Sequence, residues 1–299
     1  MSLDSILKRA ICSGLGVYYS HEVIVWFFKG FTLKILITLM ALLPTLVLAD
    51  VEYSGSAAVE QRYFFQDALY PQQERANLSF YFSPELYTSF NDGNDSILFK
   101  GFYRFDQQDE ERTHGDIREL KWTHSGNEWE VQTGISKVFW GQTESLHLVD
   151  IINQTDSVEA FDGEDKLGQP MIKVSKENNW GTIDLYWLPY FRERTFAGAA
   201  GRFRTSLVVD TDAATYESSQ EEKHIDYALR WSNTMDSIDI GLSYFDGTSR
   251  DPSFTVGTKN GSPALIPHYP LIQQLGLDLQ HTGEATIWKL EVAHRRAKA

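Results

Sequence analysis

The sequence predicts an all-β protein, an antiparallel transmembrane β-barrel in which about eleven or twelve strands are visible. Three observations predict it. From Asp50 onward, apolar residues alternate with polar or small ones, which is the period of a strand and not of a helix. The connections between these segments alternate between short turns and longer loops. Tryptophans gather near the predicted strand ends, where an amphipathic ring suits the boundary between lipid and water.

The chain begins with a segment that we interpret as an export signal. Residues 33–49 read LKILITLMALLPTLVLA, and small residues stand at the positions that a signal peptidase recognises before Asp50. A retained N-terminal anchor is the alternative. Residues 1–32 are long for the start of such a signal, which fits translation beginning at Leu33. The predicted organisation is therefore an N-terminal extension plus signal peptide over 1–49, cleaved after Ala49, and a barrel over 50–299.

Eleven strands are expected in the second part. They cover 51–66, 74–90, 96–106, 116–124, 128–139, 170–176, 181–189, 224–232, 236–245, 273–281 and 285–294. Short turns are expected at 91–95, 125–127, 177–180, 233–235 and 282–284, and very long connections at 140–169, 190–223 and 246–272. Long structureless connections are uncommon in compact soluble domains. Short turns at one end and long loops at the other are typical of a transmembrane barrel, with the turns in the periplasm.

The odd strand number needs an explanation, because single-chain bacterial barrels normally have an even number. One explanation is that the chain is a truncated piece of a larger barrel. The end of the chain, 293–299, lacks the terminal aromatic residue of a closing strand, and the last predicted strand runs into it. The other explanation is a further strand at 202–210.

The alternation also predicts which side chains face the interior. Lipid offers no hydrogen-bond partners, so the apolar rows should face lipid and the polar rows the lumen of a closed sheet. The lumen-lining candidates are Glu60, Arg62, Lys100, Arg104, Lys121, Glu130, Lys173, Asp184, Arg230, Asp239, Asp278 and Lys289. A soluble barrel with an apolar interior would show the same alternation, but eleven or more strands leave room for water inside.

The connection 140–169 is the candidate constriction. It carries Glu144, Asp150 and Asp156, and its aliphatic run 146–152 favours packing against the barrel interior. Arg192 and Arg194 follow the seventh predicted strand and could face these acids. Opposed charges across a lumen would filter solutes by their charge. A solvated outer loop and ordinary rim charges are the alternatives.

The sequence gives little support for catalysis, metal binding or nucleic-acid binding. Ser145, His147 and Asp150 have the residue types of a catalytic triad, but nothing indicates the oxyanion hole and orientation that a triad needs. The acidic stretch 162–165 lacks the oxygen spacing of a calcium loop. We expect no catalytic residue, no metal and no cofactor. The formal net charge of −14, with no basic stripe, argues against nucleic acid as a partner.

One segment also carries a resemblance. Within 134–194 stand Trp140-Gly141, then LVDIIN over 148–153 followed by Asp156, then Gly168-Gln169-Pro170, and finally LPYF over 188–191. This segment resembles porin-like, largely uncharacterised outer-membrane proteins of Gram-negative bacteria. Where related families have Asn-Pro, this chain has Asn153-Gln154. The resemblance implies a barrel that passes or binds small solutes, without naming the solute.

The expected function is therefore a porin-like channel of the bacterial outer membrane, reached after export to the periplasm. Its expected partners are outer-membrane lipid, small solutes and the barrel-assembly machinery during biogenesis. Three alternatives remain open at this point: an outer-membrane barrel enzyme such as a lipid hydrolase, a soluble periplasmic β-sandwich that binds a ligand, and a non-functional truncated barrel.

Overall fold

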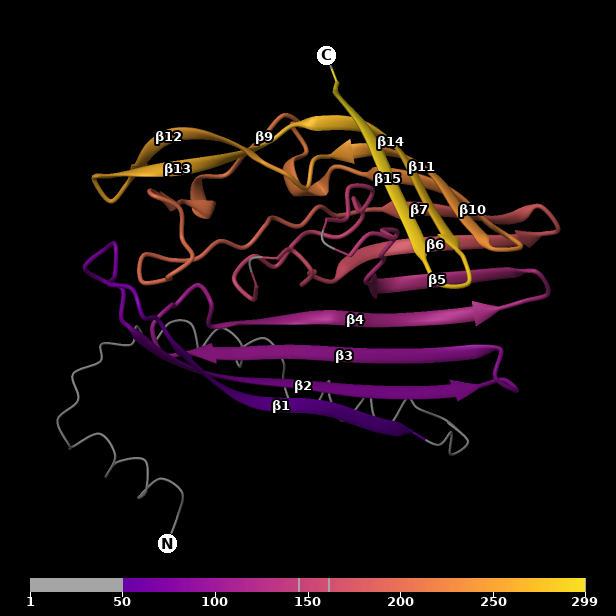
Figure 1. Ribbon diagram of the computed structural model, residues 1–299, viewed down its shortest axis with the longest axis horizontal. Coiled ribbons are helices and arrows are strands. Elements are labelled where there is room, and N and C mark those ends of the chain that lie inside the picture. The colour runs from indigo at the N-terminus through magenta and orange to yellow at the C-terminus, as the bar shows by residue number, and fades with distance from the viewer. Residues whose placement is uncertain (1–50, 145, 161, 299) are drawn as a thin grey trace, which may run out of the picture. The chain divides into compact units, whose positions relative to one another are not determined.

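The main body of the protein is a single antiparallel sheet of eleven strands. The computed structural model describes residues 51–144, 146–160 and 162–298, so the predicted signal segment 1–49 lies outside the described residues. The sheet is formed by β1 (Glu52–Tyr63), β2 (Ala76–Phe90), β3 (Asp95–Asp106), β4 (His114–Ser125), β5 (Trp129–Ser136), β6 (Gln169–Asn178), β7 (Gly181–Leu188), β10 (Asp226–Met235), β11 (Ile238–Thr248), β14 (Leu271–Thr282) and β15 (Ile287–Ala297). Each strand pairs with the next in this order (Figure 1). All eleven predicted strands are thus confirmed.

A second, smaller sheet lies within two of the predicted long loops. The hairpin of β12 (Ser253–Lys259) and β13 (Ser262–Tyr269) pairs in parallel with two short strands, β8 (Val208–Val209) and β9 (Thr215–Tyr216). The additional barrel strand predicted at 202–210 is therefore wrong. Only its last part is extended, and it pairs with β13 instead of the main sheet.

Two short 3-10 helices complete the described secondary structure. They are η1 (Thr211–Ala213) and η2 (Glu221–Lys223), and the described residues contain no α-helix. None of the helices found among these residues has the length and apolar character needed to cross a membrane.

The sheet is not closed into a barrel. The pairing order ends at β1 on one side and at β15 on the other, and within the described part of the chain these two strands do not pair with each other. In Figure 1, β1 lies along the lower side of the sheet, while β15 runs obliquely, with β14 and β11 beside it, across the view of β5 and β6. The predicted closed barrel is thus corrected to an open sheet. Period-two alternation determines the faces of a strand, but it carries no information about which strands meet at the edges.

The connections differ at the two ends of the sheet, as the sequence predicts. Tight turns join β2 to β3, β4 to β5, β6 to β7 and β10 to β11 on one side, while the long connections gather at the other (Figure 1). The turn after β2 shows why it is short. Asn91 and Asp92 both have φ near 55°, and Gly93 follows at 86°. These residue types tolerate the left-handed region at little steric cost, so the chain reverses at once.

The polarity of the sheet faces is the reverse of that in a soluble protein. Apolar rows are exposed, with Phe82 at 49% and Leu242 at 47% of their full surface. Polar rows are covered, with Ser79 at 2% and Asp278 at 1%. A soluble sheet buries its apolar row and exposes its polar row. This distribution disagrees with the soluble β-sandwich alternative.

The buried apolar cluster lies on the covered face. It includes Val149, Ile151 and Ile152 of the segment 137–168, together with side chains of β6, β7, β10, β11 and β14. The second part of the aliphatic run 146–152 therefore packs on the sheet, as expected, whereas Leu146 and Leu148 in its first part are exposed. Burying these side chains removes apolar surface from water at about 25 cal/mol per Å², which holds the segment against the sheet.

Gly134 in β5 provides a test of the sheet geometry. Its φ is +129°, and a Cβ atom at this position would lie 2.1 Å from the carbonyl oxygen of Leu120 on β4. We expect Gly134→Ala to lower the free energy of unfolding by about 1–3 kcal/mol, because both the backbone and the β4–β5 pairing would be strained. The measurement is the midpoint of urea unfolding of the purified chain.

Gly115→Ala in β4 is the matched control. Gly115 has no positive φ, and its nearest potential contacts are at 3.5 Å. This variant should leave the midpoint nearly unchanged. Equal effects of the two substitutions would show that the close approach of β4 and β5 at Gly134 is not important for stability.

Candidate functional site: the covered face and its infolded segment

The segment 137–168, which connects β5 to β6, lies on the polar face of the sheet. Asn153 joins its two ends. The Asn153 side chain accepts a hydrogen bond from the Val138 backbone N–H at 2.8 Å and donates to the carbonyl oxygens of Ser136 and Leu167 at 2.8 and 2.9 Å. One buried amide therefore holds the segment as a closed loop. Its position on the sheet is determined by charged contacts at three places.

The first contact lies on the early strands. Arg104 of β3 binds Glu159 of the segment, with its Nε 2.8 Å from both carboxylate oxygens. Arg112, between β3 and β4, donates to the Val158 carbonyl oxygen at 2.8 Å and to Asp106 at 2.6 Å. Both arginines are buried. Buried charges of this kind are stable only when they are paired, so the segment and the strands depend on each other here.

The second contact is centred on Asp156, which has no exposed surface. Its carboxylate is bound by the guanidinium of Arg118, by the imidazole of His114 at 2.9 Å and by the hydroxyl of Thr195 at 2.7 Å. Burial alone would raise the pKa of Asp156, but the hydrogen bonds and positive charges of His114 and Arg118 outweigh it and lower this pKa to about 2. Asp156 is therefore ionised throughout the neutral range.

The third contact lies on the late strands. Glu291 of β15 accepts backbone hydrogen bonds from Gln142 at 2.7 Å, Thr143 at 2.9 Å and Val149 at 3.2 Å. Arg250, after β11, donates to the Ile152 carbonyl oxygen at 3.0 and 3.1 Å. The three contacts together span the sheet from β3 to β15, so the segment bridges strands that are far apart in the pairing order.

The predicted lumen-lining residues are all buried or half-buried. Arg230 of β10 binds Asp278 of β14 through two hydrogen bonds of 2.7 and 2.8 Å. This pair passes over Gly241 of β11, where any Cβ atom would lie within 2.4 Å of both side chains. The space that this ion pair occupies explains why residue 241 is a glycine. Its bidentate geometry is the strongest form of such an ion pair.

The other candidates form weaker contacts on the same face. Lys100 lies 3.1 Å from Glu85, Lys121 3.4 Å from Glu119, Lys173 3.5 Å from Asp184, and Arg62 pairs with Glu60. Glu130 accepts a hydrogen bond from Gln132, Asp239 accepts one from Thr234, and Lys289 pairs with Glu144. Charges of both signs therefore alternate along the covered face. The role of these residues in lining a lumen stays a prediction.

The constriction candidates form different pairs from those expected. Arg192 binds Asp116 of β4 at 2.6 Å, and Arg194 binds Asp251 after β11 at 2.7 Å. Neither forms an ion pair with an acid of the segment among the described residues. Asp150 accepts hydrogen bonds from the backbone of Trp140 and Gly141 at 2.7 and 2.9 Å. Glu144 is exposed. The sequence thus predicted charged residues at this place but not their partners.

Several anchoring residues were missed by sequence reasoning, above all Arg118. The pairing of β3 with β4 shifts register next to Lys100, opposite Arg118. Such a bulge interrupts the period of two, so simple alternation cannot assign Arg118 to the covered face. Arg112 and Arg250 lie in connections, where no periodicity exists. A single sequence contains no signal that would have identified them.

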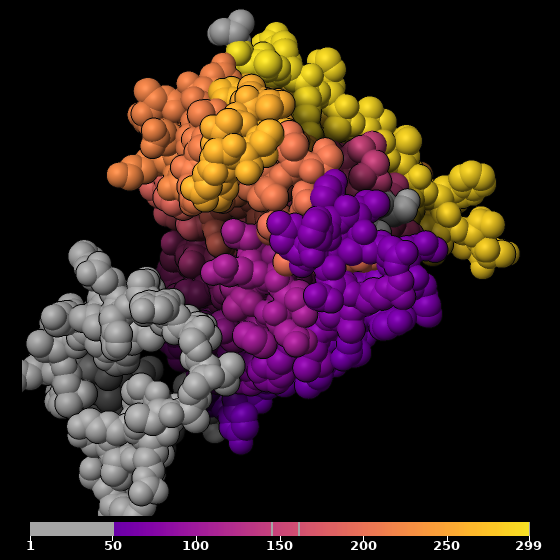
Figure 2. Space-filling view, turned by 90° about the vertical axis from the view of Figure 1, so that its left-hand side faces the viewer, coloured from indigo at the N-terminus to yellow at the C-terminus, as the bar shows by residue number. Residues whose placement is uncertain are grey.

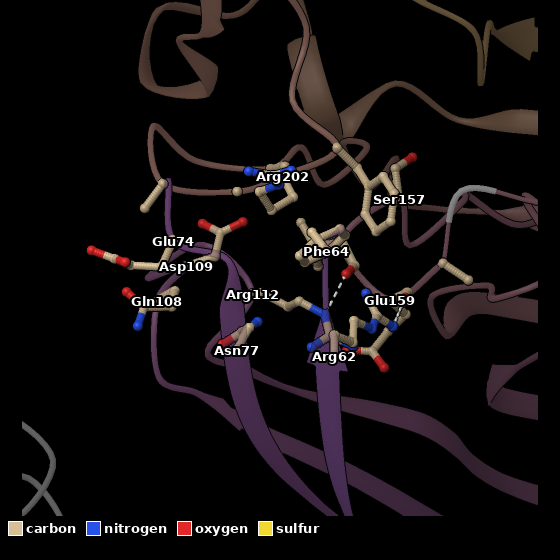
Figure 3. A pocket seen from close by; sticks show the side chains of 16 residues that line it. Arg62, Phe64, Glu74, Asn77, Gln108, Asp109, Arg112, Ser157, Glu159 and Arg202 are labelled. Atoms are coloured by element: carbon tan, nitrogen blue, oxygen red, sulfur yellow. Dashed lines mark hydrogen bonds between the residues drawn. The ribbon is translucent and has the colours of Figure 1, made fainter. Parts of the chain in front are cut away.

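Two hollows lie beside the segment. One has a volume of about 500 Å³ and is lined by Asp150 and Lys166 of the segment and by Arg194, Asp251 and Arg295. Figure 2 views the end of the molecule where the long connections gather. The other hollow, of about 30 Å³, is shown in Figure 3, where Arg62, Arg112 and Glu159 lie together below Phe64. Its size suits a single water molecule.

The described residues hold one group with the right atoms for a metal, namely His114, Asp156 and Glu159, whose ligand atoms lie within 4.8 Å of one another. Arg118 and Arg104 already neutralise both carboxylates. An ion-pair anchor explains this cluster without a metal. The structure adds no support for a catalytic triad of Ser145, His147 and Asp150. Ser145 lies outside the described residues, and the His147 side chain contacts Glu164 at 3.0 Å instead of Asp150.

The comparisons with known proteins do not identify a family. No family model and no curated protein matches the chain. Among solved structures, the chain is similar to the high-pH structure of Pseudomonas putida OprB, with a TM-score of 0.39 and 8% sequence identity. The alignment covers 81% of this chain and 66% of OprB. A likeness of this extent carries no conclusion about function.

The Asp156 contact can be tested by substitution. We expect Asp156→Asn to weaken the attachment of the segment by about 1–3 kcal/mol, because Arg118 would lose one of its two carboxylate partners and keep only Asp116, which it shares with Arg192. The measurement is the rate of limited proteolysis within 137–168. Asp162→Asn is the control, since Asp162 is exposed and its one hydrogen bond among the described residues is from the backbone N–H of Glu164. Equal rates for both variants would contradict the role of Asp156.

The attachment should also depend on pH. The pKa of Asp156 is lowered from 3.8 to about 2 in the folded protein. Its contribution, roughly 2 kcal/mol, is therefore fully present above pH 4 and is lost as the pH falls toward 2. Pepsin, which cleaves in this range, should cut the segment increasingly as the pH is lowered. In Asp156→Asn this dependence should be smaller, and an unchanged profile would argue against the assignment.

Proposed function

We propose that the protein is a porin-like channel of the outer membrane, which lets small polar solutes pass along the covered face of the sheet. The observation that carries this proposal is the reversed polarity of the sheet. Apolar rows such as Phe82 and Leu242 are exposed, and charged pairs such as Arg230–Asp278 are covered. This arrangement suits lipid on one side and a polar interior on the other.

The segment 137–168 is the proposed narrowing of the channel. It is held over the charged face by Glu159, Asp156 and Glu291, so its position does not depend on a single contact. The fixed charges beneath it would favour hydrated, polar solutes over apolar ones. We propose no reaction, because no nucleophile and base are brought together among the described residues that form this site.

The proposal requires that the sheet be closed in the membrane. The outer edges of β1 and β15 have backbone N–H and C=O groups without strand partners within the described residues, and each such group is costly in lipid. We therefore propose that these edges are paired in the membrane, either with each other or through additional strands. A non-functional, incomplete barrel is the alternative that the open edges allow. The experiment described next distinguishes a closed channel from an incomplete barrel.

The test combines gel mobility with conductance. The full chain, extracted from outer membranes in detergent, should migrate faster before boiling than after it, because a closed barrel resists unfolding by the gel detergent. In planar bilayers it should give discrete current steps, and Asp156→Asn should increase their size by loosening the segment at one of its three contacts. A boiled sample is the control. Extraction without detergent would contradict the membrane location, and a membrane-bound chain without a mobility shift or current would indicate an incomplete barrel.

A further inference from the structure

His114 connects the segment 137–168 to the chain before β4. It is the first residue of β4, and 17% of its side chain is exposed. Its ring nitrogen Nδ1 lies 3.0 Å from the backbone carbonyl oxygen of Arg112, and its Nε2 lies 2.9 Å from the carboxylate of Asp156. Both partners can only accept a hydrogen bond, because a carbonyl oxygen carries no proton and Asp156 is ionised throughout the neutral range.

These two contacts need a proton on each ring nitrogen. A neutral imidazole has one N–H group and one lone pair, whereas an imidazolium donates from both nitrogens. In a neutral ring the lone pair would face an oxygen at 2.9 or 3.0 Å, and that contact would become repulsive. The geometry of the ring therefore matches the imidazolium form of His114.

The charged groups packed around the ring come from the segment, from β3, from β4 and from the connection before β4. They are Asp156, Glu159, Arg104, Arg118 and Arg112. Arg104 pairs with Glu159 at 2.7 Å, and Arg112 pairs with Asp106 at 2.6 Å. Asp156 is therefore the acid that meets the ring directly, and it shares the guanidinium of Arg118 with Asp116.

The position of His114 and its partners determine where the ring titrates. His114 lies at the end of the sheet where the long connections gather, and β4 has twelve residues. About nine to eleven residues are enough for a strand to cross a membrane, so His114 lies outside the crossing part of β4. Burial alone would lower the pKa of His114, but the hydrogen bond and charge of Asp156 outweigh it and raise this pKa above its ordinary value of 6.5. The contribution of the protonated ring is therefore fully present below about pH 6.5 and is lost as the pH rises through the raised value.

We propose that His114 makes the attachment of the segment 137–168 depend on pH, so that it is tight while the ring is protonated and looser once the ring is neutral. A neutral ring can donate to Asp156 or to the Arg112 carbonyl oxygen, but not to both. In either case Asp156 loses the positive charge beside it. This inference deepens the proposed function and rests on it, because a looser segment would widen the proposed channel at alkaline pH.

The expected change is a loosening and not a release of the segment. Asp156 keeps its hydrogen bonds from Arg118 and Thr195 when His114 becomes neutral. The contacts that Glu159 forms with Arg104, and Glu291 with the backbone of the segment, do not involve the ring. The segment is therefore weakened at the middle one of its three contacts.

Nitrogen-15 NMR of the full chain in detergent, labelled at histidine, tests the protonation of the ring directly. His114→Gln identifies the signals of His114 by their absence. We expect both ring nitrogens to be protonated at about pH 6.5, where a free histidine has lost half of its charge, and one of them to lose its proton as the pH is raised to about 10. A ring that is mostly neutral at about pH 6.5 would overturn the inference, whether or not the chain conducts.

Limited proteolysis measures the effect on the segment 137–168. The cleavage rate is divided by that of the boiled chain, which corrects for the pH dependence of the protease. Between about pH 6 and about pH 10 this ratio should rise roughly tenfold, as expected for the loss of one charged hydrogen bond, and current steps in planar bilayers should grow. An unaltered chain whose ratio stays constant overturns the inference without any variant.

His114→Gln should remove most of this pH dependence, because glutamine stays neutral across the range. His124→Gln is the matched control. His124 lies on the same strand and also contacts a carboxylate, that of Asp95 at 2.8 Å, but its other ring nitrogen has no hydrogen-bond partner among the described residues. His124→Gln should therefore be cleaved like the unaltered chain, and equal pH dependence in the two variants would contradict the role of His114.

The two proposals fail in different ways. Cleavage that depends on pH as expected, in a chain without current steps, refutes the proposed channel and supports the pH-dependent contact of His114. Current steps together with a cleavage ratio that is independent of pH refute only the inference about His114.

Discussion

The pairing of buried arginines with carboxylates is the interaction on which the rest of the structure depends. Arg104, Arg112 and Arg118 lie on or between the early strands and are buried beneath the segment 137–168. Without Glu159 and Asp156 from that segment, part of this positive charge would be uncompensated in a poorly hydrated place. The sheet therefore needs its infolded segment, and the segment in turn needs the sheet to cover its aliphatic residues.

The mutual dependence of the sheet and the segment 137–168 explains why the segment covers the polar face of the sheet. In most proteins a sheet is covered because its apolar row must leave water. Here the apolar cluster around Ile151 and Ile152 occupies only the later strands, and ion pairs cover the earlier ones. The exposed rows, with Phe82 and Leu242 among them, would suit the apolar environment of the proposed membrane location. The same pattern would be unfavourable for a protein surrounded by water on all sides.

The sequence predicted the strands well because alternation and turn residues are local signals. The eleven strands, the short turns and the packing of Val149, Ile151 and Ile152 all follow from such signals. The second sheet was missed because β13 contains Pro263 and Pro267, and proline argues against a strand in a linear reading. The partners of Arg192 and Arg194 were missed because Asp116 and Asp251 are distant in sequence. No local pattern encodes such contacts, and closure of the sheet is equally non-local.

Arginines also connect the long loops with the late strands. Arg250 is buried and donates four hydrogen bonds, one to Asp226 and three to the backbone carbonyl oxygens of Ile152 and Thr248, so it supports the fold. Arg194 and Arg295 differ, because they divide one carboxylate between them and line a hollow. Each of the two also donates from its Nε to an amide oxygen, Arg194 to Gln154 and Arg295 to Gln274. Through the shared carboxylate of Asp251, the connections that follow β7 and β11 are tied to the last strand, so charged pairs hold the long connections together as well as the infolded segment.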